Sequence, residues 1–314
     1  MLKKTYFWVE EYLFDPNLFQ RFLSILLLPI SFLYYLVVKF KRSFTKAKDF
    51  NIAIISIGNL IVGGSGKTPF SIYLAKKLNH VAIILRGYKR QSKDLIVVSH
   101  NFKILTDVKS SGDEAMLLAK ELKNATIIVS KDRIKAIQKA KKLGAKVILL
   151  DDGFSKVNIK KFDILLKPKD EPKNPFLLPS GPYREPKSLY KSADLTLQEG
   201  VDFKRVVKIR DKTQKMILIT AISKPQRLDP FLPKEVIKKI YYPDHYSFKK
   251  DELLKLVDKY KAHSVLTTTK DLVKMENFNL KLSILELELE CDKKVLKKVE
   301  NFLSTFDKIQ SKNI

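Results

Sequence analysis

The chain contains a single cysteine, Cys291, among its 314 residues. One thiol excludes an intramolecular disulfide and any zinc cluster built from cysteines, and such sparse cysteine is typical of a reducing compartment. Arginine clusters, aromatic stacking motifs and zinc-finger spacings are also missing. The chain has no internal repeat and no low-complexity tract. The function must therefore be sought in local motifs.

Acidic residues are few compared with basic ones. The chain has 60 Lys and Arg against 34 Asp and Glu, which gives a net charge of +26. Such a charge favours polyanionic partners, namely nucleic acid, anionic lipid or phosphorylated substrates. However, the lysines are scattered along the whole chain, as a compositional bias would also produce. Because no nucleic-acid motif accompanies the charge, we expect no nucleic-acid partner.

A nearly continuous apolar run extends from Phe22 to Val38 and is near the short end of a membrane span. Pro29 would kink a helix there or break it into two. The run lacks a small-residue cleavage site, so it is not read as a removable signal peptide. We expect a membrane-associated helix, with spanning and interfacial placement both open and a buried core helix as the alternative. Basic residues follow the run and indicate the cytoplasmic side: Lys39, Lys41, Arg42, Lys46 and Lys48.

From Asn51 onward, short β-branched runs alternate with helical patterns. This alternation predicts an α/β fold, with a mostly parallel sheet and helices on both faces. The glycine-rich turn described in the next paragraph makes the predicted sheet P-loop NTPase-like. With 314 residues there is room for more than one domain. We expect an N-terminal membrane-associated segment (1–48), a nucleotide-binding core (49–205) and a smaller C-terminal α/β domain (206–314) closing over the cleft. A linker is predicted near residues 200–215, and a helix is predicted over 233–240.

The strongest single motif is a glycine-rich turn between a strand and a helix, over residues 54–69. It ends in Gly66-Lys67-Thr68. Glycines let backbone N–H groups point toward phosphates, Lys67 is placed to reach the β- and γ-phosphates, and the Thr68 hydroxyl suits Mg²⁺. The strict P-loop spacing would place its first glycine where Ile61 stands, so the motif is P-loop-like. It predicts ATP and Mg²⁺, with the nucleotide held by Gly63, Gly64, Ser65, Gly66, Lys67 and Thr68.

Carboxylates follow two of the predicted strand-to-helix turns. Asp151 and Asp152 end an apolar strand, where they are placed to hold Mg²⁺, although such a pair is often only a cap or turn. Asp113 follows Ser111-Gly112 and is either an N-cap or a carboxylate that accepts a proton from a substrate hydroxyl. His245 lies in a later loop and matters only if folding brings it to Asp113.

Three arginines lie where ligands bind in an α/β sheet, namely Arg86, Arg133 and Arg184. A guanidinium clamps phosphate through bidentate contacts, while the alternative for each is a solvated or salt-bridged side chain.

Taken together and in this order, the motifs resemble those of the tetraacyldisaccharide 4'-kinase family. The resemblance runs from the apolar N-terminal helix to about Lys274. The matching stretches are Gly58-Asn59-Leu60, Gly63 through Pro69, Arg86-Gly87-Tyr88, Gly112-Asp113-Glu114, Asp132-Arg133, Asp151 through Phe154, Gly181 through Pro186, Pro243-Asp244-His245 and Thr269-Lys270-Asp271.

The resemblance implies a kinase that transfers the γ-phosphate of ATP to the 4'-hydroxyl of an acylated glucosamine disaccharide 1-phosphate. It implies that Lys67 and Thr68 hold phosphates and Mg²⁺, and that Asp151 and Asp152 serve the metal. It also implies that Asp113, paired with His245, orients or deprotonates the sugar hydroxyl, with Lys67 counted among the catalytic groups. The implied substrate residues are Asn59, Arg86, Tyr88, Arg133, Arg184 and Glu185. In one departure, Ser155-Lys156 stands where the family commonly has Gln-His.

The implied partners are the glycolipid substrate and a membrane surface. We expect a monomer at the bacterial inner membrane, with its active site facing the cytoplasm. A different hypothesis is a membrane-associated switch ATPase without a small-molecule acceptor. Such proteins carry Lys-Gly-Gly-x-Gly-Lys-Thr, and Val62 in place of the first lysine argues against it. A basic nucleic-acid-binding protein would leave the Gly-Lys-Thr and Asp-Asp motifs unexplained.

Overall fold

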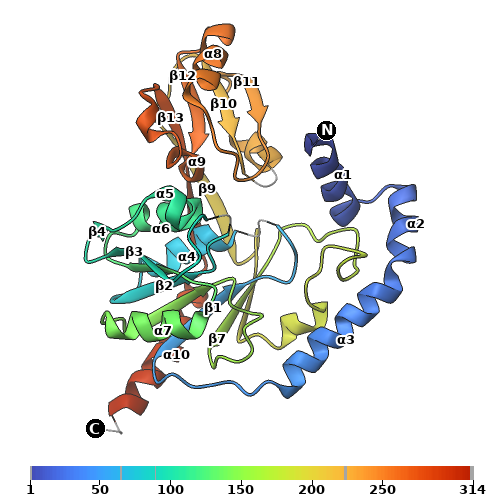
Figure 1. The fold of residues 1–314 in the computed structure, drawn as a ribbon, viewed down its shortest axis with the longest axis vertical. Helices are drawn as coiled ribbons and strands as arrows, with labels where there is room; N and C mark the ends of the chain where they lie inside the picture. The colour runs from blue at the N-terminus through green and yellow to red at the C-terminus, as the bar shows by residue number, and fades with distance from the viewer. Residues whose placement is uncertain (1, 64–65, 89, 223–224, 312–314) are drawn as a thin grey trace. The chain divides into compact units, whose positions relative to one another are not determined.

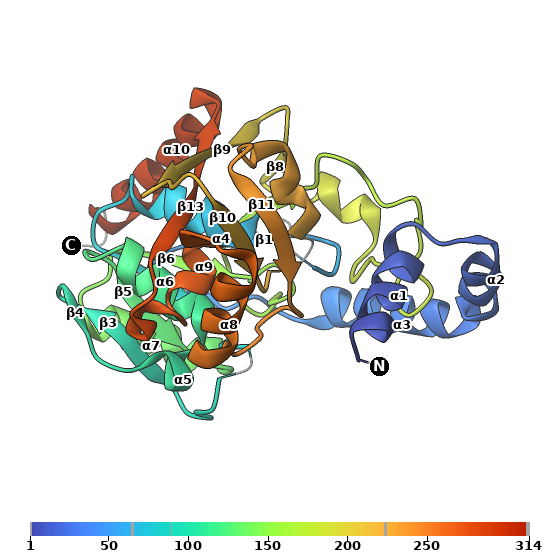
Figure 2. The same ribbon diagram turned by 90° about the horizontal axis from the view of Figure 1, so that it is seen from above.

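The structure is a computed structural model that describes residues 2–63, 66–88, 90–222 and 225–311. The chain divides into two compact units. Unit 1 comprises Met1–Lys67, Lys146–Lys204 and Cys291–Ile314, and unit 2 comprises Thr68–Ala145 and Arg205–Glu290. Figures 1 and 2 show the elements of each unit. The expected division into residues 1–48, 49–205 and 206–314 stays a prediction.

Unit 1 is built on four parallel strands in the order β6-β1-β7-β8. Their buried residues are mainly Ile, Leu and Val, as expected for parallel strands covered on both faces. The elements of this unit are α1 (Leu2–Phe14), α2 (Leu18–Leu26), α3 (Leu28–Phe44), β1 (Ala53–Gly58), β6 (Val147–Asp151), β7 (Phe162–Lys167), η1 (Lys187–Lys191), β8 (Leu195–Gln198) and α10 (Lys293–Ser311).

The apolar N-terminal run forms two helices. Asn17 caps α2 through a capping box with Gln20, and α2 ends at Leu26. The next helix, α3, has Pro29 in its first turn, where a missing N–H costs no hydrogen bond. The predicted break is thus observed at Leu27, two residues before Pro29. Among the described residues no single helix is long and apolar enough to span a membrane, although α2 and α3 together have that length and composition as a pair bent by 54°.

The long segment after β7 returns to these helices, as Figure 1 shows. Tyr12 Oη donates to the Pro179 carbonyl (2.9 Å), and Ser31 Oγ donates to the Leu177 carbonyl (3.0 Å). The buried Asn174 amide donates to the carbonyls of Tyr12 and Ser180. The N-terminal helices are therefore attached to the rest of unit 1 by polar contacts as well as by apolar packing.

Unit 2 holds strands in the order β4-β3-β5-β2, with β2 and β5 parallel and β3 antiparallel to both β5 and β4. It also holds the parallel order β11-β10-β12-β13, with β9 at the edge beside β13. The elements are α4 (Lys67–Ala75), β2 (Val81–Leu85), β3 (Ile96–His100), β4 (Lys103–Ile104), α5 (Val108–Ser111), α6 (Asp113–Glu121), β5 (Thr126–Val129), α7 (Arg133–Lys142), β9 (Phe203–Arg210), β10 (Met216–Thr220), η2 (Pro225–Phe231), β11 (Val236–Tyr241), α8 (Lys250–Tyr260), β12 (Ser264–Thr268), α9 (Thr269–Leu272), η3 (Glu276–Phe278) and β13 (Leu282–Cys291).

The predicted α/β class with mostly parallel strands is confirmed, but two local predictions are wrong. The predicted helix over 233–240 is strand β11, which pairs with β10 in parallel. Val236, Ile237 and Ile240 are β-branched, and pairing with a buried neighbour overrides the weak helical pattern. The predicted linker near residues 200–215 contains strand β9.

Candidate functional site

The glycine-rich loop joins β1 to α4 and is held by the segment that precedes η1. The Val62 N–H donates to the Pro182 carbonyl (2.8 Å), and the Arg184 N–H donates to the Leu60 carbonyl (2.7 Å). Gly63 and Gly66 have φ values of 87° and 80°, a backbone conformation that side-chain-bearing residues rarely adopt. Gly64 and Ser65 lie outside the described residues, and Thr68 follows Lys67 in the first turn of α4.

Four side chains predicted from the sequence meet beside this loop, and we call them the phosphate-site cluster: Asn59, Lys67, Asp152 and Arg184. Lys67 Nζ donates to Asn59 Oδ1 (2.9 Å) and lies 3.6 Å from Asp152 Oδ1. The Arg184 guanidinium binds both Asp152 carboxylate oxygens at 2.8 Å. Burial alone would lower the pKa of Arg184, but its contacts with Asp152 raise the pKa overall, so the guanidinium stays charged. The cluster thus has two cations around one carboxylate.

The two acids at the end of β6 differ in exposure. Asp151 is buried, whereas the Asp152 side chain is 40% exposed. Asp152 has a φ of 52°, and its N–H donates to the Ile57 carbonyl of β1 (2.9 Å). Within the described residues, no three His, Cys, Asp or Glu side chains are grouped to hold a metal by themselves. Two adjacent carboxylates do suit Mg²⁺, which takes one or two carboxylates together with substrate phosphates.

Helix α3 contributes residues that sequence reasoning did not assign to the site. Arg42 forms an ion pair with the buried Glu185, and Tyr34 Oη donates to the Arg184 carbonyl (2.7 Å). Burial raises the pKa of Glu185, and the Arg42 charge offsets this only in part. A cavity of about 280 Å³ is lined by both helix and cluster residues, including Tyr34, Arg42, Asn59, Asp152, Arg184 and Glu185. The feature of the sequence that could have pointed to Arg42 is the group of basic residues that follows the apolar run.

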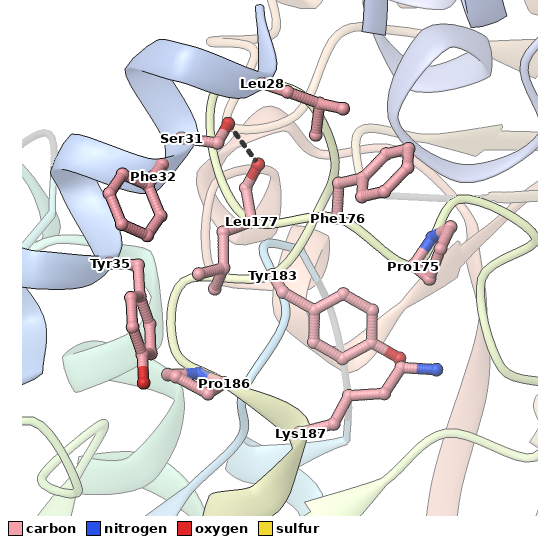
Figure 3. Close-up of a pocket in the computed structure, with 10 residues that line it drawn as sticks. All are labelled: Leu28, Ser31, Phe32, Tyr35, Pro175, Phe176, Leu177, Tyr183, Pro186 and Lys187. Carbon is pink, nitrogen blue, oxygen red and sulfur yellow. Dashed lines mark hydrogen bonds between the residues drawn. The ribbon is translucent and has the colours of Figure 1, made fainter. Parts of the chain in front are cut away.

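A second cavity, of about 550 Å³, lies between the first half of α3 and the segment that runs from Pro175 to Lys187. Figure 3 shows Phe32 and Tyr35 projecting from the helix, with Pro186 and the Tyr183 ring on the other side. Its lining is mostly apolar, and the Ser31 hydroxyl is engaged by the Leu177 carbonyl. Such a pocket suits a hydrocarbon chain.

Asp113 and His245 are in contact in unit 2. His245 Nδ1 lies 3.0 Å from Asp113 Oδ2, and their side chains are 8% and 12% exposed. Gly112, with a φ of 85°, permits the turn that opens α6 at Asp113, where the helix dipole favours a carboxylate. The His245 N–H donates to the Ala221 carbonyl (3.1 Å), and the exposed Tyr88 ring lies 5.4 Å from the imidazole between centroids.

Cations determine the ionisation of this carboxylate. Burial raises the pKa of Asp113, but the hydrogen bond and charge of His245 and the charge of Lys274 outweigh it and lower the pKa well below its usual range. Lys274 Nζ lies 3.5 Å from Asp113 Oδ2. Nearby, Lys270 Nζ contacts Asp244 (3.2 Å) and Glu114 (3.6 Å). Sequence reasoning assigned no role to either lysine, although the matching Thr-Lys-Asp stretch pointed to this segment.

Two predicted arginines lie elsewhere in unit 2. Arg86 is exposed just after β2. Arg133 is buried at the start of α7, and its Nη1 donates to the Ser130 carbonyl (2.7 Å). Their assignment to substrate, like the roles of the other predicted site residues, stays a prediction.

A strand, a glycine-rich loop and a helix that starts at Lys67, with the phosphate-site cluster beside them, define an α/β nucleotide-binding protein. The family model described as tetraacyldisaccharide-1-P 4'-kinase matches residues 23–216 and 201–304. The chain belongs to the tetraacyldisaccharide 4'-kinase family, which confirms the resemblance inferred from the motifs.

Named relatives match nearly the whole chain. The tetraacyldisaccharide 4'-kinase of Aliarcobacter butzleri (strain RM4018) is 55% identical over 98% of this chain and 100% of its own length. That of Helicobacter pylori (strain ATCC 700392 / 26695) is 48% identical over 95% of each chain. A solved structure of the Aquifex aeolicus protein, described as an "apo" form in complex with ATP, has a TM-score of 0.74 and 29% identity. The match covers 90% of this chain and 99% of that one.

Proposed function

We propose that the protein transfers the γ-phosphate of ATP to the 4'-hydroxyl of a tetraacylated glucosamine disaccharide 1-phosphate in lipid A biosynthesis. The observation that carries the proposal is the 3.0 Å contact between Asp113 and His245, two residues 132 positions apart, in a chain that belongs to this kinase family. A switch ATPase needs no group to receive an acceptor hydroxyl, and Val62 is a further argument against it.

The phosphate-site cluster supplies the nucleotide half of the reaction. Lys67 and Arg184 share the Asp152 carboxylate, so an incoming polyphosphate offers both cations more negative charge than they have now. Phosphoryl transfer requires mainly that the reacting groups are positioned and that the charge of the transition state is stabilised. Lys67 and Arg184 are two fixed cations that provide this. We assign Asn59 to hold the Lys67 ammonium in place.

Mg²⁺ would be held by Asp151 and Asp152, with the Thr68 hydroxyl as a further predicted ligand. When bound, the ion neutralises charge on the transferring phosphate. Before binding, the Asp152 carboxylate is retained by Arg184, which keeps this acid oriented.

The Asp113–His245 pair supplies the acceptor half. Because its pKa is lowered, Asp113 is ionised at neutral pH and accepts a hydrogen bond from the sugar hydroxyl. A weakly basic carboxylate suits a loose transition state, in which the attacking oxygen loses its proton late. The exposed Tyr88 ring beside the imidazole offers an apolar surface to a sugar ring.

The N-terminal helices supply the contact with lipid. Large apolar side chains of α2 and α3 are exposed, among them Phe22, Leu33 and Phe40, each at least 60% exposed. An exposed apolar face flanked by basic residues is typical of an interfacial helix. We infer a monomer at the bacterial inner membrane, with the active site on the cytoplasmic side and one substrate acyl chain in the pocket of Figure 3.

The test replaces Asp113 with alanine in detergent-purified protein supplied with labelled ATP and an acylated disaccharide 1-phosphate. We expect transfer to fall about 100-fold or more, as for loss of a general base, with ATP binding retained. Asp229→Ala, which removes an exposed acid that pairs with Lys239, is the matched control and should transfer normally. Undiminished transfer by Asp113→Ala would remove the base assignment, and acceptor-independent ATP hydrolysis by the wild type would favour the switch ATPase.

A further inference from the structure

Asp271, in α9, is a fully buried carboxylate that joins several parts of unit 2. Its Oδ2 accepts hydrogen bonds from Thr220 Oγ1 (2.7 Å) and from the Ala221 N–H (2.9 Å). Its Oδ1 lies 2.7 Å from Lys274 Nζ. A buried charge persists only when it is paired and hydrogen-bonded, so the geometry around Asp271 is tightly constrained.

Lys274 connects this buried acid to the proposed catalytic carboxylate. Its ammonium lies 2.7 Å from Asp271 and 3.5 Å from Asp113, and it donates to the Tyr246 carbonyl at 3.2 Å. The same ammonium lies 5.0 Å from the centre of the Phe248 ring, and the side chain is only 10% exposed. An ammonium held by two acids, a carbonyl and an aromatic face has little freedom to move.

Two nitrogen atoms approach the same oxygen of Asp113. His245 Nδ1 and Lys274 Nζ each approach Oδ2, at 3.0 and 3.5 Å. A carboxylate held through one oxygen has a fixed rotation, which directs its other oxygen to one place. We propose that Lys274, anchored by Asp271, is a positioning residue that fixes Asp113 so that Oδ1 receives the acceptor hydroxyl. This inference rests on the proposed role of Asp113.

Asp271 also acts on the histidine side of the pair. The Ala221 N–H donates to Asp271, while the Ala221 carbonyl accepts from the His245 N–H. Asp271 therefore fixes the backbone of His245 through Ala221. It also fixes the side chain of Asp113 through Lys274. The adjoining charged groups are Lys270, Asp244 and Glu114, with Lys270 contacting both acids.

The experiment compares Lys274→Met and Lys274→Arg in the full-length protein, using the transfer assay across a range of pH. For Lys274→Met we expect kcat to fall about 10- to 100-fold, because a small misplacement of a reacting group has that effect, with the KM for ATP unchanged. The limbs of the pH profile should move to higher pH, since removal of a cation makes protons easier to retain nearby. Lys274→Arg keeps the charge and should retain the wild-type profile.

Lys239→Met, which removes a surface lysine that pairs with Asp229, is the control and should change neither kcat nor the profile. If Lys274→Met does not fold, Lys274→Gln carries the same expectation, because glutamine is also uncharged and keeps a hydrogen-bond donor. The inference would be overturned if Lys274→Met, or Lys274→Gln in its place, kept the wild-type pH profile and lost activity only because its Tm was lower. If Asp113→Ala abolishes transfer while that profile stays unchanged, only this inference fails. If Asp113→Ala transfers normally, the proposed role of Asp113 fails first.

Discussion

At the residue scale, the contacts of Asp113 link stability to pH. Its ordinary pKa is 3.8, and in the folded protein the pKa is lower because His245 and Lys274 outweigh the effect of burial. An acid whose pKa is lowered by folding stabilises the folded state above its ordinary pKa. That contribution is lost as the pH falls from about 3.8 toward the folded value, since the unfolded state takes up a proton in this range while the folded state does not.

Asp113→Asn should therefore destabilise the protein most at neutral pH. We expect about 1.5 to 3 kcal/mol, the usual contribution of a hydrogen bond to a charged group. The difference between variant and wild type should shrink below about pH 4, because protonation of Asp113 in the unfolded wild type then favours unfolding, an effect that the asparagine lacks. Urea unfolding at several pH values from 7 to 3 measures this, and a difference that does not change with pH would contradict it.

At the element scale, α3 carries two kinds of site contact along one helix. Its first half lines the apolar pocket through Leu28, Phe32 and Tyr35, while Arg42 in its last turn pairs with Glu185. The opposite side of α3 exposes apolar residues such as Leu33. One helix therefore connects an exposed apolar surface with the phosphate-site cluster.

A substitution that fills the apolar pocket of Figure 3 tests whether an acyl chain binds there. Leu28→Trp should raise the KM for the tetraacylated acceptor by about 10-fold, the effect of losing a few methylene contacts, while the KM for ATP stays the same. Leu33→Trp places the same side chain on the exposed side of α3, outside the pocket lining, and should leave both values unchanged. Steady-state kinetics with each substrate varied would test this. If Leu28→Trp and the wild type had equal KM values for the tetraacylated acceptor, the acyl chains would not bind in this pocket.

At the scale of the whole molecule, net charge and the exposed apolar face act together. The charge of +26 attracts an anionic surface, at about 1 kcal/mol for each basic residue close to it. The apolar contribution of α2 and α3 does not depend on salt, whereas the electrostatic part is screened beyond about 10 Å at 0.1 M salt.

Binding to vesicles should thus have two components. We expect the protein to co-sediment more strongly with vesicles that contain anionic lipid, and to lose that advantage at high salt while weaker binding remains. The double variant Phe22→Glu/Phe40→Glu should lose the remaining binding, because both side chains are exposed and apolar. Vesicle binding by the double variant equal to that of the wild type would exclude this face as the lipid contact.

The sequence by itself determined the features that depend on neighbouring residues. Local backbone preference accounts for the strand before the loop, the glycines at 63 and 66, the helix starting near Lys67 and the helix break just before Pro29. The same holds for the alternation of elements that predicts the α/β class. Because these preferences act over a few neighbouring residues, they can be predicted from the sequence.

Only the tertiary structure decided which distant groups meet. Arg42 pairs with Glu185 across 143 positions, and Asp113 meets His245 across 132. Val236–Tyr241 forms a strand where the sequence predicts a helix over 233–240, because the conformation of this segment depends on pairing with β10. Likewise, no local pattern shows that Lys274 lies between Asp271 and Asp113. Such contacts arise from packing, whose free energy is shared among residues far apart in the chain.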